Sequence, residues 1–134
     1  MKLKGKVAIV TAASSDRGSA IAELLASEGA SVTINYFKNR KSAESVLKRI
    51  ENRGGKAMVK QADVTVKASV NKMVKETVRK FGSIDILVNN AHGTIRRKAL
   101  EATVWNEFTE NLNGAIKGAH NCCLAVISEM QKKK

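Results

Sequence analysis

Short apolar runs alternate along the chain with longer stretches in which apolar residues recur every three or four positions. The expected strands lie at 7–10, 31–35, 57–59 and 84–88, and the first of them is apolar throughout. A short all-apolar run is typical of a strand that is buried on both faces, as parallel strands are. Because helical spacing follows each run, the pattern predicts an α/β protein with a parallel sheet and right-handed crossovers.

The helical stretches end at glycines, which favour helix termination. The first helix ends at Gly29, the second at Gly54-Gly55 and the third, which spans 66–81, at Gly82. Apolar residues then step by three or four from 104 to 130, which predicts one long amphipathic helix. With no linker or internal repeat in between, we expect a single domain over residues 1–134.

Charge and cysteine content narrow the functional classes. The net charge of +12 favours anionic partners, either nucleotide phosphates or nucleic acid. Cys122 and Cys123 are adjacent, which gives no disulfide framework and no metal-ligand spacing, so we expect no metal site and a reducing, cytoplasmic location. The first apolar run is too short for a signal peptide or a membrane span, so no membrane partner is expected.

The first run breaks into small residues, Thr11-Ala12-Ala13-Ser14-Ser15-Asp16-Arg17-Gly18, and a helix then opens. Small residues let backbone N–H groups approach a phosphate at a helix N-terminus. The stretch resembles the Thr-Gly-x-x-x-Gly-x-Gly turn with which short-chain dehydrogenases/reductases bind a nicotinamide dinucleotide. Ala12 and Asp16 stand where the family has glycine.

Three further motifs resemble the same family in the same order. Asp63-Val64-Thr65 follows the third strand, and Asn89-Asn90-Ala91 follows the fourth, with His92 in place of glycine. Asn111-Leu112-Asn113-Gly114 resembles the family's Asn-Leu-x-Gly. The resemblance covers the family's N-terminal half. It implies a truncated Rossmann-like, doubly wound sheet of about four strands in the order 3-2-1-4, with helices on both faces.

The resemblance also implies site residues. In the family the aspartate at Asp63 hydrogen-bonds the adenine, and the asparagine at Asn111 belongs to the catalytic tetrad. The expected cofactor-binding residues are Thr11, Ala13, Ser14, Ser15, Arg17, Gly18, Tyr36, Lys38, Asp63, Val64, Asn89, Asn90 and Ala91. Simpler roles stay open: Asp63 as a turn or cap residue, and the asparagine amides as bridges between loops. His92 is expected to be a loop residue, and Trp105 to pack its helix onto neighbours.

The end of the second strand indicates the choice of cofactor. Family members that use NAD generally have an acidic residue there, whereas those that use NADP offer positive charge to the 2′-phosphate. This chain has Tyr36, then Phe37, Lys38, Asn39, Arg40 and Lys41, and its first acid is Glu44. NADP is therefore expected rather than NAD. The alternative is that these side chains form an ordinary solvated basic face.

The family's catalytic serine, tyrosine and lysine have no counterpart in these residues, since the only tyrosine, Tyr36, ends the second strand. We therefore expect no unaided turnover. Asp16 is an expected helix N-cap whose carboxylate would compete with a pyrophosphate, and Ala12 would be strained at positive φ. Dinucleotide binding is accordingly expected to be weak or absent.

These observations favour the interpretation that the chain resembles an oxidoreductase of the short-chain dehydrogenase/reductase family. In its overall sequence it is similar to ketoacyl reductases. We expect a homo-oligomer, formed through the open edge of the fourth strand and the 104–130 helix. A non-catalytic docking module is the alternative. Nucleic-acid binding through the basic region at 38–60 is less favoured, because aromatic residues make up only 4% of the chain.

Overall fold

The computed structural model describes residues 1–94 and 96–133. Its sheet contains four parallel strands in the order β3-β2-β1-β4, which confirms the predicted fold class and strand order. The strands are β1 (Val7–Val10), β2 (Ser31–Tyr36), β3 (Lys56–Gln61) and β4 (Ile86–Val88). The central strands β1 and β2 are almost fully buried, as their apolar sequences require.

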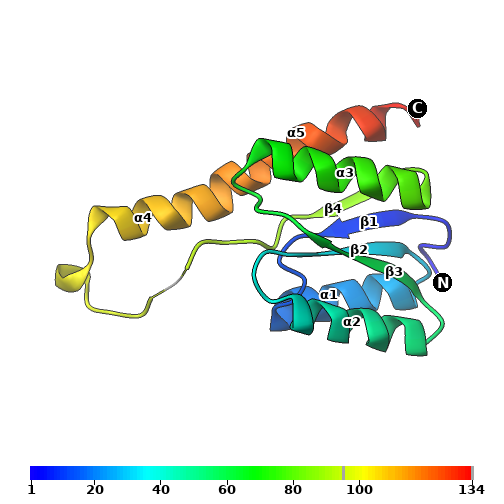
Figure 1. Ribbon diagram of the computed structural model, residues 1–134, viewed down its shortest axis with the longest axis horizontal. Coiled ribbons are helices and arrows are strands. Elements are labelled where there is room, and N and C mark those ends of the chain that lie inside the picture. The colour runs from blue at the N-terminus through cyan, green and yellow to red at the C-terminus, as the bar shows by residue number, and fades with distance from the viewer. Residues whose placement is uncertain (95, 134) are drawn as a thin grey trace.

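Helices cover both faces of this sheet, as Figure 1 shows. α1 and α2 lie on one face, and α3 and α5 lie on the other. The helices are α1 (Asp16–Ser27), α2 (Arg40–Asn52), α3 (Lys67–Phe81), α4 (Trp105–Leu112) and α5 (Gly118–Gln131), and a 3₁₀ turn, η1, lies at Leu100–Ala102. α4 extends past the carboxyl ends of the strands and away from the sheet (Figure 1).

The long helix predicted over 104–130 is present, but it contains a wide turn. Residues 105–131 are helical throughout, and the π-helical segment η2 (Asn113–Lys117) separates α4 from α5. Two glycines allow close packing here: a Cβ at Gly114 would lie 2.3 Å from the Gly93 nitrogen, and one at Gly118 would lie 2.6 Å from Val64 Cγ2. The spacing therefore predicted the helix correctly but could not reveal this local widening.

Two apolar clusters, one on each face, hold the layers together. Ile34 belongs to the cluster beneath α1 and α2, and Ile9 to the cluster beneath α3 and α5, and both are fully buried. Burial of each such side chain contributes about 1.5–3 kcal/mol. A buried polar contact joins the sheet to α3: the hydroxyl oxygens of Thr33 in β2 and Thr77 in α3 lie 2.9 Å apart.

The helix ends agree with the glycine pattern but correct one prediction. Gly29 and Gly82 follow α1 and α3 with φ of 96° and 88°, as expected of terminating glycines. The N-cap of α1 is Ser15 rather than Asp16: Ser15 Oγ accepts a hydrogen bond from Gly18 N at 3.2 Å. Asp16 is instead the first helical residue, because α1 begins one residue earlier than the sequence suggested.

The prediction for Trp105 is wrong within the described part of the chain. Its side chain is 71% exposed and contacts Phe108, with the ring centroids 6.1 Å apart. α4 projects beyond the sheet, and among the described residues no strand or helix covers this side of it (Figure 1). The exposed large apolar residues of this region form what we call the α4–α5 face: Val104, Trp105, Phe108, Leu112, Ile116, Leu124 and Ile127.

Among the described residues, no helix combines the length and the apolar character that crossing a bilayer requires.

Candidate functional site

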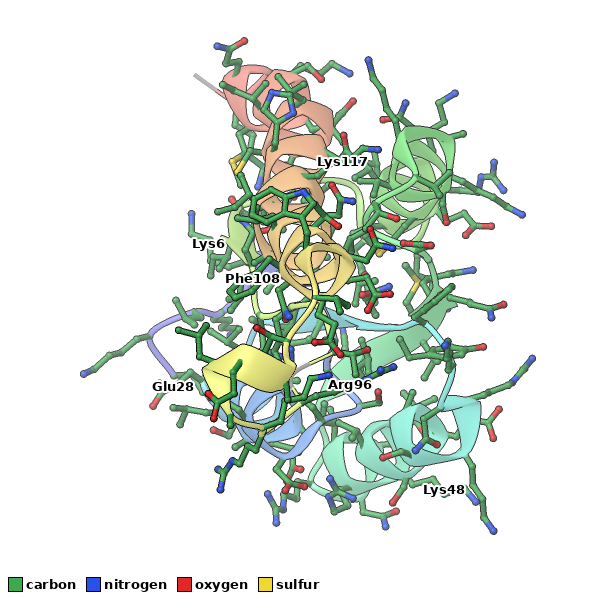
Figure 2. The ribbon with its side chains drawn as sticks, turned by 90° about the vertical axis from the view of Figure 1, so that its left-hand side faces the viewer. Lys6, Glu28, Lys48, Arg96, Phe108 and Lys117 are labelled. Carbon is green, nitrogen blue, oxygen red and sulfur yellow. The ribbon has the colours of Figure 1, made fainter. Side chains whose placement is uncertain are left out.

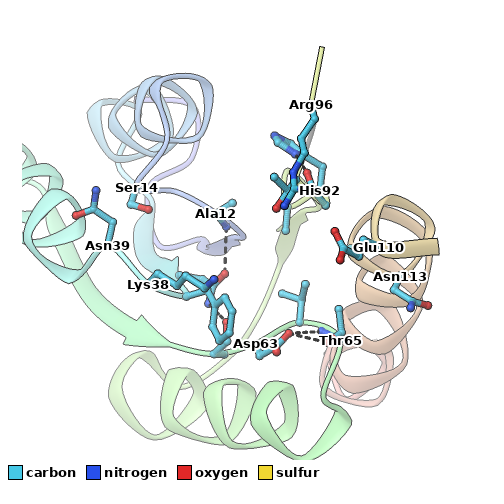
Figure 3. Close-up of a pocket in the computed structure, with 18 residues that line it drawn as sticks. Ala12, Ser14, Lys38, Asn39, Asp63, Thr65, His92, Arg96, Glu110 and Asn113 are labelled. Carbon is cyan, nitrogen blue, oxygen red and sulfur yellow. Dashed lines mark hydrogen bonds between the residues drawn. The ribbon is translucent and has the colours of Figure 1, made fainter. Parts of the chain in front are cut away.

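The main cavity, of about 710 Å³, opens at the carboxyl ends of the strands. In an open α/β sheet this edge is where ligands bind. Figure 3 shows the turn after β1 and the start of α2 on one side, the β3–α3 turn below, and the segment after β4 with α4 and η2 on the other side. The polar side chains of the cavity therefore come from five separate parts of the chain.

The turn after β1 is tied to the end of β4 by Asn90 and Thr11. Asn90 Nδ2 donates to the Thr11 and Ala12 carbonyl oxygens at 3.1 and 3.2 Å. Thr11 Oγ1 accepts from the backbone N–H groups of Asn90 and Ala91, both at 2.9 Å. Asn90 thus bridges two loops, which is the structural role that the sequence left open for it.

Ala12 adopts the left-handed conformation, with φ of 49°, so the strain expected at this position is present. Such a conformation costs a residue other than glycine about 1–2 kcal/mol. A buried asparagine helps to hold it: Asn35 Oδ1 accepts from Ala12 N at 3.1 Å, and Asn35 Nδ2 donates to the Ala62 carbonyl at 3.2 Å. Sequence reasoning missed Asn35, although a polar residue inside an apolar strand was a usable signal.

The start of α1 fits a phosphate in shape. A Cβ on Gly18 would lie 2.4 Å from the Ala12 carbonyl oxygen, so only glycine allows this tight turn. Among the described residues, the backbone N–H groups of Asp16 and Arg17 donate to no acceptor within the chain, as is usual in the first turn of a helix. The charge fits less well, because the Asp16 carboxylate lies in this same first turn.

Asp63 combines the two roles that were considered for it. Its Oδ1 accepts from Thr65 N at 2.9 Å and from Thr65 Oγ1 at 2.7 Å, which makes a turn before α3. Within the described part of the chain, Oδ2 accepts no hydrogen bond, and the residue lines the cavity. One carboxylate oxygen therefore shapes the loop while the other is available to a donor such as an exocyclic amine.

The α2 side of the cavity carries positive charge. Lys38 and Asn39 line it, and Asn39 also caps α2 by accepting from Ser42 N at 3.0 Å. Ser42 Oγ in turn donates to the Ser14 carbonyl at 2.9 Å, which connects the start of α2 to the turn after β1. Arg40 is engaged elsewhere: its Nε donates to Glu44 at 2.8 Å, and this bond raises the pKa of the guanidinium.

The opposite side is formed by the segment after β4. His92 and Arg96 lie there together, with Glu110 of α4 beside them (Figure 3). Asn111 does not line the cavity: its Nδ2 donates to the Thr94 carbonyl at 3.2 Å and to the Glu107 carbonyl at 2.9 Å. In this structure Asn111 therefore anchors the segment that carries His92.

Glu107 of α4 holds the same segment through ion pairs with Arg96 and Lys98. Its carboxylate accepts from Lys98 Nζ at 2.6 Å, and this hydrogen bond, together with the Val104 N–H and the charges of Lys98 and Arg96, holds the pKa of Glu107 below its usual range. Figure 2 looks at the molecule from the end where α4 projects, and Arg96 and Phe108 lie at this near end.

The structure distributes the predicted site residues over three environments. Those that line the cavity are Ser14, Lys38, Asp63, Val64 and Ala91. Those that shape the turn or the loop behind its wall are Thr11, Ala13, Ser15, Gly18 and Asn90. Those that lie elsewhere are Arg17 and Asn89, which are exposed, Tyr36, which is 5% exposed in the core, and Asn111.

Several cavity-lining residues were not predicted to bind the cofactor. They are Ala12, Asn35, Phe37, Asn39, Ala62, Thr65, His92, Gly93, Thr94, Arg96, Glu110, Asn113 and Gly114. Phe37, rather than Tyr36 as the sequence predicted, lines the cavity at the end of β2. In residues 1–94 and 96–133, no group of three or more His, Cys, Asp or Glu side chains gathers in a way that could hold a metal ion.

Comparison with known proteins gives a consistent result. A family model described as short chain dehydrogenase matches residues 6–134. The chain is 36% identical over 129 residues to a 3-oxoacyl-acyl-carrier-protein reductase, FabG, of Staphylococcus epidermidis, covering 96% of this chain and 52% of that protein. It is 42% identical over 113 residues to a hydroxynaphthalene reductase of Aspergillus fumigatus, covering 84% of this chain and 41% of that protein.

The solved structures agree with the relatives. A short chain dehydrogenase from Burkholderia cenocepacia in complex with NADP is 35% identical, with a TM-score of 0.89, and the match covers 97% of this chain and 53% of that one. A dehydrogenase/reductase from Sinorhizobium meliloti is 33% identical, with a TM-score of 0.91 and coverage of 96% and 51%. The chain thus spans about half the length of the relatives that it matches most fully.

Proposed function

Because this chain belongs to the short-chain dehydrogenase/reductase family, we propose that its cavity binds a nicotinamide adenine dinucleotide for a reaction that interconverts a carbonyl and an alcohol. Two features at one sheet edge support this proposal. Among the described residues, the Gly18 turn leaves the backbone N–H groups of Asp16 and Arg17 without an acceptor, and Asp63 Oδ2 accepts no hydrogen bond. The turn would take the pyrophosphate and Asp63 the adenine amine. The dinucleotide supplies or accepts the hydride when it is bound.

NADP is the preferred cofactor in this proposal. Lys38 and Asn39 line the α2 side of the cavity, and no carboxylate follows β2 before Glu44, whose charge is already paired with Arg40. A ribose 2′-phosphate there would meet the Lys38 ammonium and the N-terminus of α2. The Burkholderia structure, which contains NADP, supports the same choice.

Affinity is expected to be modest because of Asp16. The carboxylate adds negative charge to the same helix N-terminus that would hold the pyrophosphate, whereas the cavity shape is preserved. Asp16→Asn keeps the size of the side chain and removes its charge, and should tighten NADPH binding by about 3- to 10-fold. Glu51→Gln is the matched control, since Glu51 is an exposed carboxylate near the end of α2 that does not line the cavity.

Calorimetric titration of the chain with NADPH and NADH tests the proposal. We expect saturable binding, tighter for NADPH than for NADH, and weakened by Lys38→Ala. Absence of saturation by either dinucleotide at millimolar concentration, in both the unmodified chain and Asp16→Asn, would refute it.

Catalysis by these residues alone is not expected. The only tyrosine, Tyr36, is buried in the core beneath α1 and α2, and Asn111 is the one family tetrad position that is matched. A proton donor for the substrate oxygen is therefore not among the residues around the cavity that match the family pattern. A ketoacyl-type substrate for the whole protein remains our expectation from its relatives, and the cytoplasm remains its expected location.

A second proposal concerns assembly. The α4–α5 face places Trp105, Leu112 and Ile116 in solvent, with exposures of 51% or more. An apolar face of this kind favours self-association. Ile116→Glu should convert a dimer into a monomer in analytical ultracentrifugation, whereas Leu24→Glu, at an exposed leucine of α1, should not. An unmodified chain that stays monomeric at tens of micromolar would contradict this proposal. The involvement of the open edge of β4 in this self-association stays a prediction.

Nucleic-acid binding is the least supported function. Four of the cations in the basic region, Arg40, Arg49, Arg53 and Lys60, form ion pairs with acidic side chains. Their charge is then largely compensated on the surface where phosphates would lie.

A further inference from the structure

His92 stands where the family pattern has glycine, and the main chain beside it is held firmly. A Cβ on Gly93 would lie 2.5 Å from Asn111 Cα, and one on Gly114 would lie 2.3 Å from Gly93 N. The two glycines therefore pack backbone against backbone where the segment after β4 crosses α4 and η2. Asn111, through its bond to the Thr94 carbonyl, fixes the other end of this short stretch.

The imidazole of His92 is oriented by one hydrogen bond. Its Nδ1 lies 2.6 Å from the Gly93 carbonyl oxygen. A carbonyl oxygen can only accept, so Nδ1 carries the proton. Nε2 is then an acceptor when the ring is neutral and a second donor when it is protonated. Since the residue lines the cavity and is exposed, this change of charge takes place at the ligand site.

The other charged side chains that line the cavity cancel, and the Asp16 carboxylate lies beyond this lining, in the first turn of α1. Lys38, from the β2–α2 loop, and Arg96, from the same segment as His92, are positive. Asp63, from the β3–α3 turn, and Glu110, from α4, are negative. Protonation of His92 would therefore give the lining one net positive charge, which partly offsets the Asp16 carboxylate toward a ligand that carries two or more negative charges.

We infer that His92 supplies a proton-dependent positive charge on the wall of the cavity across from the turn after β1, so that the cavity binds the anionic dinucleotide more tightly as the pH falls. This inference rests on the proposed dinucleotide binding. An anionic ligand stabilises the imidazolium over the neutral ring, and by linkage its binding takes up protons.

The experiment is a calorimetric titration with NADH at pH 5.5 and pH 8. NADH is chosen because it lacks the 2′-phosphate, whose own second ionisation near pH 6 would add a slope from the ligand. We expect affinity about 3- to 10-fold higher at pH 5.5. Titrations in two buffers of different ionisation enthalpy should show net proton uptake at intermediate pH. Where NADH binds too weakly, the difference between variants is measured with NADPH, because the ligand's own titration is common to both.

Three variants separate His92 from every other source of pH dependence. His92→Gln should abolish both the slope and the proton uptake, and His92→Lys should bind tightly at both pH values. His120→Gln, at the only other histidine of the chain and away from the cavity, should behave as the unmodified protein. Circular dichroism confirms that each variant is folded.

The outcomes distinguish the two proposals. Saturable binding whose pH dependence survives in His92→Gln, or is absent from the unmodified chain, would overturn the inference about His92 and leave the proposed function standing. No saturable binding of NADH or NADPH at any pH would overturn the proposed function, and the inference with it.

Discussion

Replacing Ala12 by glycine should stabilise the chain, although most substitutions destabilise. Ala12 has φ of 49°, a conformation that costs a residue with a Cβ about 1–2 kcal/mol and costs glycine almost nothing. Glycine also raises the entropy of the unfolded chain, which offsets about 0.4–1 kcal/mol of this gain. The methyl group is half-exposed at the cavity, so its loss leaves no buried void. The net gain is about 0.5–1 kcal/mol.

Urea denaturation at pH 7 measures this free energy of unfolding, and thermal denaturation should show a rise of about 2–4 °C in Tm. Ala13→Gly is the matched control, because Ala13 is fully buried and is not among the residues with positive φ. That change removes a buried methyl and should destabilise by about 1–2 kcal/mol. Equal destabilisation by the two substitutions would refute the claim that the Ala12 backbone is strained.

Three further substitutions test other features of the structure. Gly18→Ala should lower Tm markedly in thermal denaturation, because the new methyl would lie 2.4 Å from a backbone oxygen, and unchanged stability would mean that the turn is not this tight. Burial raises the pKa of Asp85, but Lys133, the Val7 N–H and Lys6 outweigh it, so the pKa lies below its usual range. Its stabilising effect is then present above the ordinary carboxyl pKa near 4 and is lost as the pH falls below it, so Asp85→Asn should destabilise the chain at pH 7 and by progressively less at acid pH in urea titrations. Burial raises the pKa of the Cys122 thiol to about 11, so this thiol should resist iodoacetamide at pH 8 in the folded Cys123→Ala variant, and rapid alkylation there would show that the site is open.

The sheet and its order could be predicted because they depend on patterns that a sequence displays directly. The apolar run at β1 permits only a buried strand, and glycines such as Gly29 and Gly82 mark where helices must end. The third strand, with lysines at Lys56 and Lys60, lies at an edge of the sheet as its charge suggested. Each of these features is decided within a few residues, so tertiary contacts had little to change.

The details of the site depend on contacts that no local pattern contains. Tyr36 and Phe37 are neighbours on an extended chain, and which of them faces the cavity is decided by register against β3. Trp105 would be buried if α4 lay on the sheet, but the crossing at Gly93 directs this helix away from it. His92 stood outside the family pattern, so resemblance alone gave it no function.

The turn after β1 shows how a family motif can keep its shape without its glycine. Asn35 accepts from the Ala12 N–H, and Asn90 donates to the Ala12 carbonyl, so the peptide groups on both sides of the strained residue are held by side-chain amides. These two bonds, each contributing about 1 kcal/mol, are sufficient to offset the cost of the left-handed backbone. The geometry that would receive a pyrophosphate is therefore retained, and the Asp16 carboxylate is the feature that opposes an anion. Affinity for the dinucleotide should accordingly respond to changes in charge at Asp16 and His92 far more than to the restoration of glycine at position 12.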